Sequence, residues 1–547
     1  MNPPIKAACK IIPVIALVVC SFHSCNTGQP SKTQTGSSPA HIRSAYAIID
    51  PTYNAEHLVP EPDVSPGAPW LYGPVELESW KHQQMQVSSK AVAHNGNYPG
   101  VYHVPFRQVS YRCRLSPEVE LPDRVEIRSN AAIIVWLGEK EVFSGDLSER
   151  SHTVDLAAGI NGSRVLLVKA SAEAEPPALL IENGPFFTAS GTWEWNDGIT
   201  GWQAAAAFPQ TQSGVLPHQM EMPEVILKPE KREGILYDFG RELIGYVTFH
   251  CDGSPSVIVG ESVTEALDTI VSHHEQILTL TMTGQGEWTS KHPLAFRYLQ
   301  ILGKDPAEVR CRAQFWPTQY KGAFACSDSL LTRIWMAAAY THRLNKYEFM
   351  LDGIKRDRLP WIDNMKISSA VEAYTFGDPE ILKRAISVLG RESDKSSINN
   401  IIDYDALWVI SQDAFQLNFD DPGFLRQEWP RIYAMIERIA ATCDANGLRR
   451  WPQGSWTFID WVSGWDKNMV EQVMRLLTGD SAEPVNSPSM ICYEIQTLAE
   501  TGKAAEALLK LKKIWGAMLD AGATTFWEGY DERETGDDIY RFYDRPG

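Results

Sequence analysis

The chain lacks the features that mark nucleic-acid-binding and zinc proteins. Its 547 residues carry a formal net charge of −18. This argues against nucleic acid as a partner, because phosphate binding needs clustered lysine and arginine. The nine cysteines include no CxxC pair, so no zinc site is predicted. We expect neither a metal nor a cofactor, although a calcium site built from scattered oxygen ligands would leave no such pattern.

A long membrane-spanning run is also missing. Lys6 and Lys10 precede a short apolar stretch from Ile11 to Phe22, which is typical of an export signal rather than of a membrane helix. It ends at Cys25, before a tract rich in Ser, Thr, Gly and Pro. This resembles a bacterial lipoprotein signal in which Cys25 is lipidated and the tract is a tether. An ordinary secretory signal is the alternative. Either predicts export, to the periplasm or the outer membrane, with membrane contact only through the lipid anchor.

The remaining cysteines are widely scattered. Export permits disulfides, but the spacing does not say which of them form. Buried free thiols are the simpler interpretation. These residues are Cys113, Cys251, Cys311, Cys326, Cys443 and Cys492.

Patterning divides the rest of the chain into a β-like part and a helical part. Up to about residue 320, short runs such as Ala132–Leu137 alternate apolar and polar residues between Gly, Pro and Asn-Gly turns. That length fits two β-sandwich domains, of which the first either binds carbohydrate or braces the protein. The expected segments are a signal (1–25), a linker (26–45), two β-sandwich domains (46–190 and 191–320) and a helical domain (321–547).

Beyond residue 321, apolar residues recur at helical spacing. The first helix is predicted just after a Ser/Asp N-cap at Ser327 and Asp328. No strand pattern alternates with these helices, which predicts an all-α domain built from helical hairpins. Further helices are expected near residues 379–390, 405–417, 428–442, 488–501 and 503–520.

Residues 351–364 hold the densest group of ionisable side chains. Gly353 and Pro360 break any helix there, so a pocket wall is favoured over a surface charge network. A glycosidase needs one protonated carboxyl to donate to the leaving oxygen and a second, ionised carboxylate on the opposite face of the ring. The candidate side chains are Asp352, Arg356, Asp357, Arg358, Trp361 and Asp363.

Two more segments combine aromatic and acidic residues. Glu528 directly follows Trp527 at the end of a predicted helix, where a helix-terminal acidic loop is the alternative. The stretch from Trp451 to Trp465 carries four tryptophans around Asp460 and Asp466, with Gly and Pro that disfavour a core helix. Because a flat apolar ring face binds sugars, this stretch is interpreted as part of a sugar cleft.

The segment Asp352-Gly-Ile-Lys-Arg-Asp-Arg-Leu-Pro-Trp361 resembles the signature of bacterial α-L-rhamnosidases with an (α/α)6 barrel. Phe324-Ala-Cys-Ser-Asp-Ser-Leu-Leu and Gly522-Ala-Thr-Thr-Phe-Trp-Glu528 resemble the same family. So do Tyr237-Asp-Phe-Gly-Arg-Glu-Leu-Ile-Gly-Tyr-Val and Phe296-Arg-Tyr-Leu, which are similar to that family's β-sandwich domain. The resemblance runs from about residue 190 to the end.

This resemblance implies roles for individual residues. Asp357 would be the general acid and Glu528 the general base of an inverting hydrolysis, about 6.5–9.5 Å apart. Asp352 and Arg356 would bind sugar hydroxyls. The aromatic walls of the sugar site would be Trp361, Trp461 and Trp527, and the cleft would also include Asp363, Asn364 and Asp460.

The chain departs from the family pattern at three places. The family's Trp-x-Gly-Asp is here Trp361-Ile-Asp-Asn364, so an amide stands where the last carboxylate is expected. The run from Trp461 to Asn486 is shorter than the family leads us to expect, and the chain stops at Gly547 before the expected closing helices. We therefore expect an incomplete barrel.

The leading hypothesis is an exported α-L-rhamnosidase that acts on rhamnose-containing, plant-type glycans. The alternative from another class is a glycan-binding lipoprotein of the same fold that has lost turnover. A third hypothesis is a hydrolase of this fold that acts on another sugar.

Overall fold

A computed structural model describes most of the chain between residues 67 and 530. The described ranges are 67–92, 108–146, 150–157, 162–173, 175–210, 215–270, 274, 276–355, 358–392, 397–444 and 488–530. The predicted signal and linker lie outside them. So do five of the predicted site residues: Cys25, Arg356, Asp357, Asp460 and Trp461.

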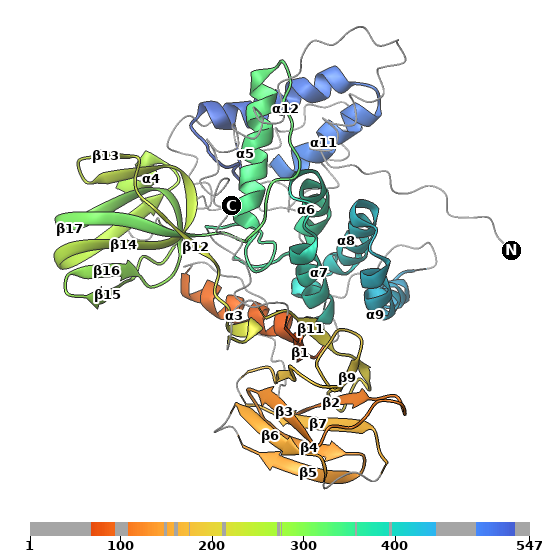
Figure 1. The fold of residues 1–547 in the computed structure, drawn as a ribbon. Coiled ribbons are helices and arrows are strands. Elements are labelled where there is room, and N and C mark those ends of the chain that lie inside the picture. Colours follow the sequence, from red (N-terminus) through yellow and green to blue (C-terminus); the bar gives the residue numbers. More distant parts are fainter. Residues whose placement is uncertain are drawn as a thin grey trace, which may run out of the picture. The chain divides into compact units, whose positions relative to one another are not determined.

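The first of two compact units ends at Glu221 and is a β-sandwich (Figure 1). One sheet has the order β11 (Ala206–Phe208), β1 (Trp70–Tyr72), β8 (Leu179–Leu180), β3 (Arg124–Ser129) and β6 (Ser151–Asp155). The other has the order β10 (Gln203–Ala204), β9 (Trp193–Asn196), β2 (Val109–Arg114), β7 (Val165–Ser171), β4 (Ala132–Leu137) and β5 (Lys140–Gly145). Both sheets contribute side chains to one core, for example Ile127 and Tyr111, as period-2 alternation requires.

Two features of this unit differ from the expectation. Strands β9 to β11 pair with β2 and β1, so the first β unit continues past residue 190. Helix α3 (Glu76–Val92), most of which belongs to this unit, also forms in a stretch interpreted as β-like. Glu76 and Glu78 in its first turn favour a helix start, but the helix has no strong apolar stripe to reveal it.

The second unit begins with an antiparallel sheet made largely by two long strands, β14 (Leu236–Gly260) and β17 (Leu294–Gln314). Register shifts bend β14, so that Tyr298 and Gln300 of β17 pair with β14 residues on both sides. The other elements are β12 (Glu224–Leu227), β13 (Lys231–Glu233), β15 (Leu280–Gly284), β16 (Glu287–Ser290) and α4 (Val263–Leu267).

Helices follow the sheet, which confirms the predicted order of β domains and then an α region. Asp328 caps α5 as expected, accepting hydrogen bonds from the backbone N–H of Leu330 (3.0 Å) and Leu331 (3.4 Å). The helices are α5 (Ser329–Asn345), α6 (Ile362–Thr375), α7 (Glu380–Glu392), α8 (Tyr404–Phe419), α9 (Pro422–Ala441), α11 (Pro488–Glu500) and α12 (Ala504–Asp520).

From α5 to α9 each helix packs against the next, and α6 also packs against α8. Helix α11 packs against α12, and α12 packs against α5. Leu331 and Ile334 of α5 share a core with Leu511 and Trp515 of α12. On another side of α5, Tyr340 belongs to the core of the β14–β17 sheet. Helix α5 therefore joins the sheet to the helical region.

Three properties of the described residues concern membrane-spanning helices, metal ligands and cysteines. No described helix is both long enough and apolar enough to cross a membrane. No cluster of three or more metal-ligating side chains occurs among the described residues. The six cysteines from Cys113 to Cys492 are free thiols, and Cys113, Cys251 and Cys311 are buried.

Gly245, in the segment Tyr237–Val247, marks the closest approach of β14 to β17. A Cβ on it would lie 2.7 Å from the Cα of Ala313 and would overlap the carbonyl oxygen of Arg312. Because both obstacles are backbone atoms, we expect Gly245→Ala to lower the free energy of unfolding by about 1–3 kcal/mol. Urea unfolding would measure it. Gly284→Ala, which meets only an exposed Glu287 side chain, is the control, and equal losses in both variants would contradict this account.

Candidate active site

The loop between α5 and α6 carries the first group of predicted site residues. Its ends are fixed by backbone hydrogen bonds from Leu351 to Asn345 (2.9 Å) and from Asp352 to Leu359 (3.0 Å). Asp352 is half-buried, and its Oδ1 accepts a hydrogen bond from Asn364 Nδ2 at 2.7 Å. The structure therefore brings these two predicted residues into direct contact.

Arg358 has a structural role in this loop. Its guanidinium is buried and donates to the carbonyls of Ile354 and Pro293, both at 2.5 Å, and to Gln276 Oε1 at 2.8 Å. Gln276 in turn bonds both backbone groups of Ala295 on β17. Arg358 thus pins the loop to the sheet, and the fork of guanidinium donors suits this task.

Lys355 anchors the same loop at a second point. Its Nζ lies 2.6 Å from Glu265 Oε1 and 3.8 Å from Glu261 Oε2. Lys355 and Arg358 flank positions 356 and 357, so the segment on either side of the predicted acid is held against the sheet domain.

Trp361 and Asp363 begin helix α6. Trp361 is only 8% exposed and packs edge-on against Tyr404, with ring centroids 6.2 Å apart. Only a small part of the Trp361 ring is therefore open to a sugar, and this residue contributes little surface to the predicted aromatic wall. Asp363 lies in the first turn of α6, where a carboxylate is favoured by the helix dipole, and accepts a hydrogen bond from the backbone N–H of Asn364 at 3.0 Å.

The loop after α12 carries the second group. Trp527 is half-buried against Tyr530, with ring centroids 6.4 Å apart, and Glu528 is exposed. The loop is bound upstream of these residues: Thr524 Oγ1 accepts from the backbone N–H of Glu242 at 2.9 Å, and the backbone N–H of Phe526 donates to Thr341 Oγ1 at 2.9 Å.

Arg297 completes the attachment of this second loop. One guanidinium nitrogen donates to the carbonyl of Gly522 at 3.0 Å, while the others form a two-point ion pair with Asp238 at 3.0 and 3.2 Å. Asp238 and Arg297 come from the two β-domain motifs singled out in the sequence. Those motifs therefore support the candidate active site rather than only their own sheet.

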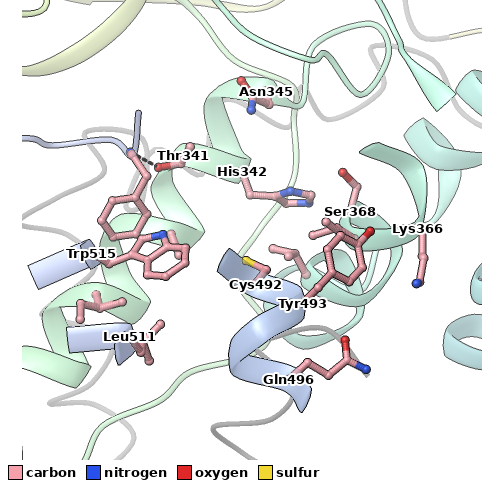
Figure 2. A pocket seen from close by; sticks show the side chains of 15 residues that line it. Thr341, His342, Asn345, Lys366, Ser368, Cys492, Tyr493, Gln496, Leu511 and Trp515 are labelled. Carbon is pink, nitrogen blue, oxygen red and sulfur yellow. Dashed lines mark hydrogen bonds between the residues drawn. The ribbon is translucent and has the colours of Figure 1, made fainter. Parts of the chain in front are cut away.

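A cavity of about 230 Å³ lies among α5, α6, α11 and α12, with Phe526 in its wall (Figure 2). Apolar side chains, including Trp515 and Leu511, make up one part of its lining, and Thr341, His342 and Lys366 bring polar groups to it. The sequence did not single out these residues, because each follows ordinary helical core or surface spacing. Their shared cavity arises only when helices distant in the chain pack together.

Glu372 of α6 forms a buried ionic network with His342 and Lys346 at the C-terminal end of α5. The Glu372 carboxylate is fully buried and bonds His342 Nε2 and Lys346 Nζ, each at 2.8 Å. Burial by itself would raise the pKa of Glu372, but the hydrogen bond from His342 and the charge of Lys346 outweigh it and lower the pKa. Lys346 also lies 3.4 Å from Asp378. The network ties α5 to α6 at the polar part of the cavity.

The Asn364–Asp352 pair gives a pH-dependent test. In Asn364→Asp, a second carboxyl would replace the amide that now donates to Asp352 at 2.7 Å. Two carboxyls this close raise the pKa of the pair, because both cannot easily be ionised together. A group whose pKa is raised in the folded protein contributes stability at low pH, and this contribution is lost as the pH rises. We expect the free energy of unfolding to fall below wild type by about 1–2 kcal/mol at pH 8, and by less at pH 5. Asn364→Ala is the control, and an equal pH profile for both variants would contradict the contact.

One protein-family model matches part of the helical region. Residues 319–478 match the family model described as the bacterial alpha-L-rhamnosidase 6 hairpin glycosidase domain. Among curated proteins, none matches this chain.

Several solved structures are similar at low identity. A rhamnosidase from Klebsiella oxytoca with rhamnose bound is 19% identical with a TM-score of 0.47, covering 60% of this chain and 86% of that one. A GH78 family rhamnosidase of Bacillus sp. GL1 is 15% identical with a TM-score of 0.44, covering 88% and 66%. A Streptomyces avermitilis α-L-rhamnosidase complexed with L-rhamnose is 15% identical with a TM-score of 0.37, covering 73% and 48%.

The family model spans the loop from Asp352 to Asn364 and the helices on both sides of it. Residues 319–478 of this chain are therefore similar to the six-hairpin glycosidase domain of bacterial alpha-L-rhamnosidases.

Proposed function

We propose that this protein hydrolyses terminal α-L-rhamnosyl residues of plant-type glycans by an inverting acid/base mechanism. The observation that carries the proposal is the match of residues 319–478 to the six-hairpin glycosidase domain. The attachment of both carboxylate-bearing loops to the β14–β17 sheet supports it, since an inverting pair acts only at a defined separation.

In this mechanism Asp357 protonates the glycosidic oxygen as the bond to the anomeric carbon breaks. Glu528 takes a proton from a water molecule that attacks the opposite face of the ring. The exposure of Glu528 suits a group that must reach a water. Asp352 accepts hydrogen bonds from sugar hydroxyls, and the Asn364 amide keeps the Asp352 carboxylate oriented through its 2.7 Å hydrogen bond.

The two carboxyls should respond differently to the leaving group. With purified residues 26–547, we expect Asp357→Asn to lose about 10²- to 10⁴-fold in kcat on an unactivated alkyl α-L-rhamnoside, and much less on an activated aryl rhamnoside. Glu528→Gln should lose activity to a similar extent on both, because water attack is common to them. Released sugar and its anomeric form are followed by NMR. The control is Glu437→Gln, on the exposed face of α9.

Activity in both carboxylate variants like that of Glu437→Gln would contradict the assigned roles. An amide at position 364 favours the second candidate, a glycan-binding protein without turnover. Such a protein would bind rhamnose, as measured by calorimetry, while no sugar is released from any rhamnoside. Turnover confined to other aryl glycosides would instead indicate another sugar.

We also propose that the chain is exported and anchored through lipid on Cys25. The charged start, the short apolar run to Phe22 and the Ser/Thr/Gly/Pro tract after Cys25 support this. In a Gram-negative host, metabolic labelling with a fatty-acid probe should mark the wild type and Cys20→Ala but not Cys25→Ala. Equal labelling of all three, or none in the exported wild type, would contradict the anchor and favour an ordinary secretory signal.

A further inference from the structure

Glu242 lies on β14 where the sheet bonds the Glu528 loop, and its carboxyl is not used by the mechanism above. The side chain is only 2% exposed, and Oε1 has no hydrogen-bond partner among the described residues. Its backbone is fully used: the N–H donates to Thr524 Oγ1 at 2.9 Å and the carbonyl accepts from Tyr340 Oη at 2.7 Å. The residue therefore touches the Glu528 loop and helix α5 directly.

Four charged side chains influence the pKa of this carboxyl, namely Glu261, Glu265, Lys355 and Arg297. Burial raises the pKa of Glu242 well above its ordinary value, and Glu261 and Glu265 raise it further, while Lys355 and Arg297 lower it without reversing the shift. The two cations already have anionic partners, because Lys355 pairs with Glu265 at 2.6 Å and Arg297 pairs with Asp238 at 3.0 Å. An ionised Glu242 would add a buried charge without a free counter-ion.

The two cations belong to opposite site loops. Lys355 is part of the Asp352 loop, and Arg297 holds the carbonyl of Gly522 at the start of the Glu528 loop. The electrostatic surroundings of one buried carboxyl thus link the two segments that carry the candidate acid and base.

We propose that Glu242 is a positioning residue, whose buried carboxyl and backbone hydrogen bonds help to hold the Asp352 and Glu528 loops at a fixed separation on the sheet. Its kinetic consequence rests on the proposed function, whereas its structural consequence does not. Truncating the side chain would leave a void on β14 beside the contacts to Thr524 and Tyr340, and would change the electrostatic surroundings of Lys355 and Arg297. Both loops should then open more often.

Hydrogen exchange tests the structural part. In the full chain, we expect Glu242→Ala to speed amide exchange about tenfold or more in peptides that cover residues 351–361 and 521–528. The matched control is Glu428→Ala, which removes an equally buried glutamate bonded to Ser387 and Arg431 on α7 and α9. It should leave exchange in both loops unchanged. Unchanged exchange in Glu242→Ala, or equal acceleration in both variants, would overturn the proposal.

Glu242→Gln keeps the shape and the neutral charge, and so tests the proposal even if the alanine variant does not fold. Its loop exchange at pH 7 should match wild type. As the pH rises toward the raised pKa of Glu242, wild-type loops should exchange increasingly faster than those of Glu242→Gln after correction for the intrinsic rate. Loops that open at pH 7 in Glu242→Gln would show that an ionised carboxylate is required, and would overturn the proposal.

Rhamnoside turnover tests the kinetic part. We expect Glu242→Ala to lower kcat by about 10- to 100-fold with a smaller change in KM, and Glu242→Gln to restore most of it. Equal kcat losses in the two variants would overturn the positioning role. A wild type without turnover but with the exchange pattern above would instead contradict the proposed function and leave the positioning of the loops standing.

Discussion

Both loops of the candidate active site depend on hydrogen bonds and ion pairs to one antiparallel sheet. Arg358 reaches across to Pro293 and Gln276, and Thr524 accepts from a backbone N–H of β14. Breaking such a contact leaves a buried donor or charge without a partner, which costs more than an exposed contact contributes. The sheet therefore positions both loops, and the register between β14 and β17 sets the distance between the points where the loops are attached.

Helix α5 connects this sheet to the rest of the helical region. It contributes Tyr340 to the sheet core and Leu331 to the core shared with α11 and α12. Near its C-terminal end, His342 and Lys346 bond the buried Glu372 of α6. Buried ion pairs add little net stability, but removing one partner is costly, so the network fixes how α5 and α6 lie against each other.

The pairing of Asn364 with Asp352 shows how one substitution changes the chemistry of a site. An amide can donate to a carboxylate, whereas a second carboxylate in that place would have to share a proton with it. The observed 2.7 Å contact therefore orients Asp352 without perturbing it by a like charge.

Much of the architecture was predictable from local patterns. Apolar spacing and the Asp328 cap located α5, and similar spacing located α7, α8, α9, α11 and α12, because a helix is specified by residues three and four apart. Helix α6 was not among the expected helices. Gly353 and Pro360 correctly predicted a loop, and the structure brings Asn364 and Asp352 into contact. Helix α3, with a weak apolar stripe, was missed for the same reason.

What the sequence by itself determined was the order of β units followed by helices, the resemblance of the helical region to bacterial α-L-rhamnosidases and the composition of the two site loops. Only the tertiary structure decided that Arg358 is a buried anchor, that Trp361 is nearly covered, and that β9 to β11 belong to the first β unit. It also decided that the backbone of Glu242 bonds both Thr524 and Tyr340. These facts depend on contacts between residues far apart in the chain, which local periodicity does not encode and packing alone establishes.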